Sequence, residues 1–149
     1  MRRRWKRCVG SSRKLSKRRR TEMLGGKGAD FGLLWLRLWM GSGIALHGFQ
    51  KVFGGMMPRF IEGVAQMGFP LPVVFAWAAA LSELAGGALI VLGLGTRWAA
   101  AAVFTTMSVA AFLAHAADPL SAKELALAYW TIAGALIFLG PGRLSLDRE

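Results

Sequence analysis

Cysteine and acidic residues are scarce in this sequence of 149 residues. It contains one cysteine, Cys8, and eight Asp and Glu against 19 Lys and Arg. A single cysteine excludes an intramolecular disulfide, a CxxC redox pair, a CxxCH haem attachment and a thiolate metal cluster. No covalently bound cofactor is therefore expected, and any redox chemistry would use a cofactor that binds non-covalently.

The shortage of acidic residues matters mainly at the N-terminal end. Residues 1–27 hold twelve Lys and Arg and the single acidic residue Glu22, whereas residues 28–149 hold seven of each sign. Because this segment has few apolar residues, residues 1–30 are predicted to form a disordered basic tail. Such a tail is typical of a cytoplasmic flank that fixes membrane topology, and no nucleic-acid partner is expected. A start at Met23 would leave every apolar segment intact.

Apolar residues dominate the rest of the chain, since 54% of the sequence is hydrophobic. Four stretches are each long enough to cross most or all of a hydrocarbon layer of about 30 Å. They lie at 31–49, 73–94, 98–117 and about 121–139. The sequence therefore predicts an all-α integral membrane protein, an antiparallel bundle of four transmembrane helices over residues 31–140, with a short polar C-terminal tail at 141–149.

Charge near the ends of these stretches predicts the orientation. The basic tail, Arg97 between the second and third stretches, and Arg143 with Arg148 after the fourth would all lie on one side. Because cytoplasmic loops are enriched in Lys and Arg, this side is predicted to be cytoplasmic. The protein is then multi-pass in the cytoplasmic (plasma) membrane, with both termini cytoplasmic.

Two opposite charges fall inside the apolar stretches. Arg37 lies ten residues before His47, and Glu83 lies ten residues after Val73 on a helix of opposite direction. At 1.5 Å per residue, both are expected about 15 Å from the outer end of their helices. This depth predicts a buried Arg37–Glu83 ion pair at the midplane, which could either lock two helices together or belong to a binding site.

A second group of titratable residues is expected at the outer face: His47, Lys51, His115 and Glu124. Such a cluster can transfer protons, attract an anion or donate hydrogen bonds to a quinone. Structural explanations remain open, because Glu124 follows Ser121 in the spacing of a capping box and Lys51 can extend to the interface. No metal site is predicted, since Glu83 would lie about 15 Å too deep to complete a ligand set.

Several motifs in order resemble the DoxX family of small four-helix bacterial membrane proteins. They are "LLWLRLWMGSGIALHGFQKVFG", "ELAGGALIVLGLGTRWAA", a third stretch ending in "AAFLAH", and "GPGRLSLD". Together they cover the chain from about Leu33 to Asp147. The resemblance implies a bacterial membrane protein with relatives among subunits of thiosulfate:quinone oxidoreductase and among membrane complexes that handle oxidative or thiol stress.

The leading functional prediction is a quinone-interacting or accessory subunit of a membrane oxidoreductase complex. In it, His47, His115 and Glu124 would transfer protons, Lys51 would attract an anionic donor, and Arg37 with Glu83 would form the buried pair. Expected partners are the lipid bilayer and other membrane or soluble redox subunits, or further copies of the chain. Two alternatives are a small oligomeric transporter and a membrane scaffold or assembly subunit without chemistry of its own.

Overall fold

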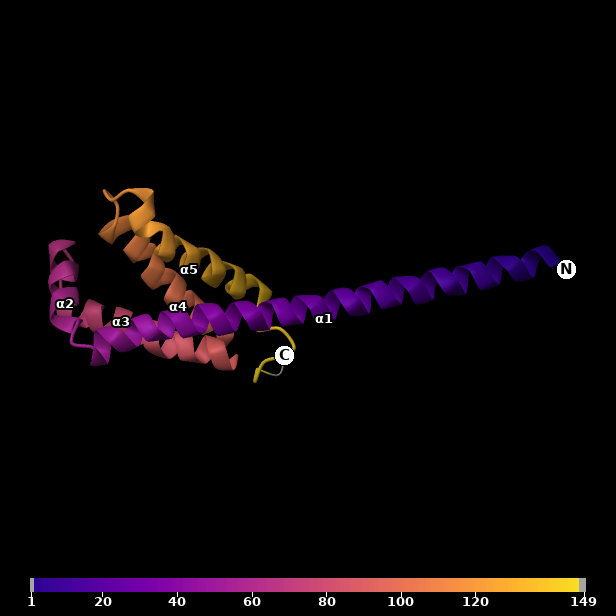
Figure 1. Ribbon diagram of the computed structural model, residues 1–149, viewed down its shortest axis with the longest axis horizontal. Helices are drawn as coiled ribbons and strands as arrows, with labels where there is room; N and C mark the ends of the chain where they lie inside the picture. Colours follow the sequence, from indigo (N-terminus) through magenta and orange to yellow (C-terminus); the bar gives the residue numbers. More distant parts are fainter. Residues whose placement is uncertain (1, 148–149) are drawn as a thin grey trace.

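The computed structural model describes residues 2–147, with side chains from Gly26 onward. The described residues form α-helices joined by short turns, as the sequence predicts, and include no β-strand. The helices are α1 (Arg2–Phe53), α2 (Met57–Gln66), α3 (Pro72–Leu92), α4 (Thr96–Val109), its continuation as a short π-helix, η1 (Ala110–Ala114), and α5 (Leu120–Leu139). Figure 1 shows them in chain order from indigo to yellow.

The breaks between helices follow local backbone chemistry. Pro58 and Pro72 lie in the first turns of α2 and α3, where the missing proline N–H leaves no hydrogen bond unmade. Gly93 ends α3 in the left-handed conformation, with a φ of 70°, and its N–H donates to the Leu89 and Ile90 carbonyls. A residue with a side chain would be strained at this C-cap. The turn between α3 and α4 therefore has a clear physical cause.

Three helices of the described chain are long and apolar enough to cross a membrane: α3, α4 together with η1 (Thr96–Ala114), and α5. Large apolar side chains on these helices remain exposed, including Trp98 at 85% and Phe138 at 84%. In a membrane protein such surfaces face lipid. The hydrocarbon core contains no water, so these apolar side chains need not be buried inside the protein. The helical, integral membrane architecture is thus confirmed, and α1 is not among these three spans.

The longest helix, α1, extends beyond the rest of the molecule toward the N-terminus (Figure 1). It continues without a break over residues 2–30 of the basic segment, so the structure has helix from Arg2 where the sequence predicts disorder. Arg and Lys are favourable helix formers and this segment has no proline, which accounts for the difference. The division of the chain at residue 30 stays a prediction.

Glycines set the register in which α1 packs antiparallel to α3. A Cβ atom added at Gly87 would lie 2.6 Å from the Ala45 nitrogen, and one at Gly48 would clash with the backbone of Leu84. Because small residues let two helix backbones approach closely, these positions fix which residues of the two helices face each other. Arg37 consequently lies beside the C-terminal end of α3, and Lys51 lies beside its middle.

Buried apolar residues form two clusters. The larger joins α1, α3, α4 and α5 through residues such as Met40, Ile90, Val103 and Leu136. The smaller joins α2 to the first half of α3. The second cluster places α2 next to the point where Lys51 of α1 meets Glu83 of α3.

Candidate functional site

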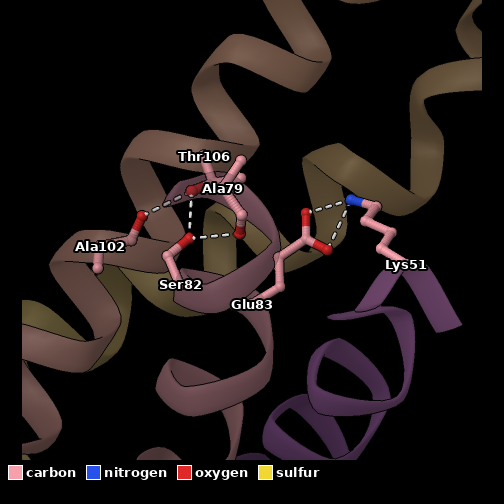
Figure 2. Close-up of polar contacts among 6 residues, drawn as sticks. All are labelled: Lys51, Ala79, Ser82, Glu83, Ala102 and Thr106. Carbon is pink, nitrogen blue, oxygen red and sulfur yellow. Dashed lines mark hydrogen bonds and ion pairs between the residues drawn. The ribbon is translucent and has the colours of Figure 1, made fainter. Parts of the chain in front are cut away.

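Lys51 and Glu83 form a buried ion pair between α1 and α3. The ammonium nitrogen of Lys51 lies 2.6 Å from each carboxylate oxygen of Glu83, as Figure 2 shows. The Glu83 side chain is only 2% exposed and that of Lys51 is 21% exposed. The same nitrogen lies 4.3 Å from the centre of the Phe60 ring on α2, a cation–π geometry. The pair therefore joins three helices at one point.

The predicted Arg37–Glu83 ion pair is wrong. The Arg37 guanidinium donates instead to four backbone carbonyls: Ile90 at 3.0 Å, Val91 at 3.2 Å, Pro141 at 2.7 Å and Leu144 at 2.9 Å. Equal distance from the ends of two apolar stretches gives equal depth only if those ends are level. The glycine contacts shift α1 along α3, so Arg37 faces the C-terminal end of α3. Lys51 lies beside Glu83, in the position that the sequence predicts for Arg37.

The C-terminal segment folds back onto the helices and completes the surroundings of Arg37. The Asp147 carboxylate accepts hydrogen bonds from the backbone N–H groups of Gly95, at 2.9 Å, and Thr96, at 3.1 Å. These two donors hold the pKa of Asp147 below its ordinary value, and the positive charge of Arg37 adds to the effect. The segment predicted as a polar tail is therefore a structural cap on the first turn of α4.

A cavity of about 710 Å³ lies among α2, α3, α4 and η1. Aromatic and small apolar side chains form most of its wall, among them Phe60, Val64, Phe69, Phe75, Ala79 and Val109. Its polar lining residues are Lys51, Ser82, Glu83, Thr105, Thr106 and His115. The hydroxyl oxygens of Ser82 and Thr106 lie 2.6 Å apart (Figure 2). An apolar chamber with a few convergent polar groups is the usual form of a small-molecule site.

A smaller cavity, of about 200 Å³, shares Lys51, Glu83 and His115 with the larger one. Its polar lining comes from His47, Lys51, Glu83, His115 and Tyr129. The rings of His47 and Tyr129 meet edge to face with centroids 6.0 Å apart. The structure thus brings His47, Lys51 and His115 together as predicted and adds Glu83 to them, while their chemical roles stay predictions.

Glu124 does not join this group. It is exposed on α5 and lines neither cavity. The N-cap of α5 is Pro119, with no side-chain capping bond, so the capping-box interpretation is wrong as well. Tyr129 is instead the α5 residue whose polar side chain lines the smaller cavity. The sequence analysis does not predict it as a site residue, and the one feature that sets it apart in the sequence is that it is the only tyrosine. A proton-transfer role for Glu124 stays a prediction.

The turn that follows η1 contains a contact between a histidine and a carboxylate. His115 Nδ1 lies 2.7 Å from Asp118 Oδ2, and the two side chains are 43% and 48% exposed. The preceding π-helix, Ala110–Ala114, contributes residues to the walls of both cavities. Short π-helical segments occur often at functional sites. Among the described residues, no group of three His, Cys, Asp or Glu side chains is placed to hold a metal ion.

Comparison with known proteins supports a membrane role. The sequence profile of the DoxX family matches residues 32–116. The inner membrane protein YphA of Escherichia coli (strain K12) is 33% identical over 113 residues, which cover 70% of this chain and 79% of YphA. No solved structure matches the chain.

Proposed function

The chain belongs to the DoxX family of membrane proteins, and from this premise we propose that it is a quinone-binding subunit of a membrane oxidoreductase. The observation that carries the proposal is the Lys51–Glu83 pair in the wall of the 710 Å³ cavity, which is otherwise mostly apolar. The volume lies within the range of about 300–1,000 Å³ that is usual for small-molecule sites. A quinone has an apolar body and carbonyl oxygens, and this chamber offers a matching surface for both.

Lys51 is suited to anchor a quinone carbonyl. An ammonium group has three N–H donors, and the two oxygens of Glu83 accept two of them. We assign the third, which the Phe60 ring contact leaves without a hydrogen-bond acceptor, to a ligand oxygen. Because Glu83 neutralises Lys51, the proposed site carries no net charge from this pair, which favours a neutral ligand in an apolar chamber. The anionic donor that the sequence analysis expects Lys51 to attract would have to compete with Glu83 for the ammonium group.

His115 is the proposed proton donor. Reduction of a quinone to a quinol takes two electrons and two protons. The electrons would come from a reduced partner redox subunit, and the protons from the His115 imidazolium, one at a time. Its side chain is 43% exposed, so the imidazole can regain a proton from water between the two transfers. His47 lines the smaller cavity and is assigned to the relay of protons toward Lys51 and Glu83.

Residues 31–53 of α1 are proposed as the fourth membrane crossing. This part of α1 packs antiparallel against α3, which is itself long and apolar enough to span. It also exposes large apolar side chains, including Phe31, Trp39, Leu46 and Phe53. With four crossings both termini lie on one side, and the basic N-terminal segment assigns that side to the cytoplasm of a bacterial plasma membrane.

Photoaffinity labelling tests the proposed site. We expect an azidoquinone to label peptides from α2, α3 and η1 of the protein in lipid nanodiscs, and an excess of unmodified quinone to suppress the labelling. Ala79→Phe fills the cavity and should abolish labelling, whereas Ala88→Phe, at an exposed position of α3 outside the cavity, should not. Labelling spread over lipid-facing residues without competition would contradict the proposal, and solute flux into proteoliposomes of the protein alone would then favour a transporter.

A further inference from the structure

The turn between η1 and α5 contains a histidine–aspartate dyad that the sequence motifs do not predict. His115 is the C-cap residue that follows η1, and its Nδ1 atom lies 2.7 Å from Asp118 Oδ2. The backbone closes the turn independently of these side chains, because the Asp118 N–H donates to the His115 carbonyl at 3.2 Å. The carboxylate is therefore not required to form the turn, and its contact with the ring calls for another explanation.

A carboxylate at this distance decides which ring nitrogen carries the proton. An ionised carboxylate can only accept a hydrogen bond, so the Nδ1 atom of His115 must be the donor. This holds for the neutral ring and for the imidazolium. In the neutral ring the Nε2 atom is then the unprotonated one. Carboxylates fix histidine ligands of metals in the same way, by holding one ring nitrogen so that the other serves the ligand.

We infer that Asp118 is a positioning residue that holds His115 in the Nδ1–H tautomer and leaves Nε2 to exchange protons with the ligand of the cavity. The inference deepens the proposed function and rests on it for the identity of that ligand. When the imidazolium gives its Nε2 proton to a quinone oxygen that has received electrons from the partner subunit, the ring becomes neutral. The product is the tautomer that Asp118 stabilises, and Nε2 then takes the next proton from water.

The other charged groups near His115 do not offer this contact. Lys51 and Glu83 line the same cavities, but they are bonded to each other. Lys123 on α5 donates to the Ala116 carbonyl at 3.5 Å. His47 provides an internal comparison, because among the described residues its ring contacts Tyr129 and no carboxylate. Asp118 is thus the group that distinguishes the two histidines of the chain.

Nitrogen NMR of histidine-labelled protein tests the inference directly. Protonated and unprotonated ring nitrogens differ widely in ¹⁵N chemical shift, and the chain has only two histidines, so a His47→Gln sample assigns both. At alkaline pH, we expect the wild-type His115 to be mainly the Nδ1–H tautomer. Asp118→Ala should shift it mainly to the Nε2–H tautomer that free histidine prefers in water, and Asp118→Glu should restore the wild-type pattern.

Two controls separate positioning from a merely structural role. The His47 signals should be unchanged in Asp118→Ala, and Glu124→Ala, which removes another exposed carboxylate near this end of α5, should leave both rings unchanged. A wild-type His115 that is mainly the Nε2–H tautomer overturns the inference, even if no variant folds. So does a tautomer that Asp118→Ala does not alter. If the tautomer responds as expected but azidoquinone labelling fails, the positioning by Asp118 stands and the quinone proposal falls.

Discussion

At the scale of single residues, Glu83 depends on one neighbour for its charge. Both of its carboxylate oxygens are bound by Lys51, and its side chain is almost completely buried. A buried carboxylate without a partner is costly, because the protein interior replaces little of its lost hydration. The two residues should therefore behave as one unit, and replacing only one of them should cost more than replacing both.

Lys51→Met tests this dependence. We expect the variant to lose about 3 kcal/mol of stability, because the change leaves a carboxylate buried and unpaired. The double variant Lys51→Met, Glu83→Leu should recover most of the loss, since no buried charge remains. Reversible unfolding in mixed micelles measures both values.

Arg59→Met is the matched control, since Arg59 is an exposed cation on α2, and it should change stability little. The expectation fails if the double variant is as unstable as Lys51→Met alone. A loss of the same size in Arg59→Met would instead indicate a general effect of removing positive charge.

The sequence predicted the kinds of residue at the site better than their pairing. Lys51, His47 and His115 were expected near one another and do line a common cavity. The predicted Arg37–Glu83 pair assumes that the ends of the two apolar stretches are level. The contacts between the helices shift those ends and place Arg37 among carbonyl groups instead.

At the scale of elements, the segment at residues 54–72 contains a helix that a search for long apolar stretches does not predict. It contains proline, glycine and charge and lies between the first two predicted apolar stretches, yet residues 57–66 form the helix α2. Pro58 is compatible with helix because it lies in the first turn. Met57 and Val64 are seven residues apart, hence on one face, and both pack against the first half of α3. A helix this short carries too few apolar residues to be recognised as a membrane span.

The close approach of α1 to α3 leads to a prediction about Gly48. A methyl group at this position would meet the backbone nitrogen and Cα of Leu84, which cannot move as a flexible side-chain end can. We expect Gly48→Ala to destabilise the protein by about 1–3 kcal/mol, the usual cost of overpacking. Gly32→Ala, in the same helix but with no atom within 4 Å of the added methyl, should be neutral or slightly stabilising.

Thermal unfolding of the two alanine variants in the same detergent measures the difference. Equal melting temperatures would show that α1 and α3 can separate at Gly48 without loss of packing. In that case the glycine contacts would not be what sets the register of Arg37 and Lys51.

At the scale of the whole molecule, the end opposite α2 is held together by polar contacts rather than by apolar packing alone. Arg37 of α1 binds carbonyls of α3 and of the C-terminal segment, and Asp147 of that segment caps α4. The Asp147 N–H also donates to the Gly93 carbonyl at 2.8 Å. Segments more than 100 residues apart in sequence thus meet at one end of the bundle, which no motif in a single stretch could have predicted.

This arrangement makes part of the stability depend on the charge of Asp147. Its pKa is lowered from the ordinary 3.8, chiefly by the N–H of Gly95 and then by that of Thr96. A group whose pKa is lower in the folded state stabilises that state fully above its ordinary pKa and loses this contribution as the pH falls through the lowered one. We therefore expect Asp147→Asn to melt below the wild type at neutral pH and the gap to close in acid. Glu62→Gln, at an exposed position of α2, should show no such gap, and a gap for Asp147→Asn that stays constant down to strongly acidic pH would mean that the side chain acts without its charge.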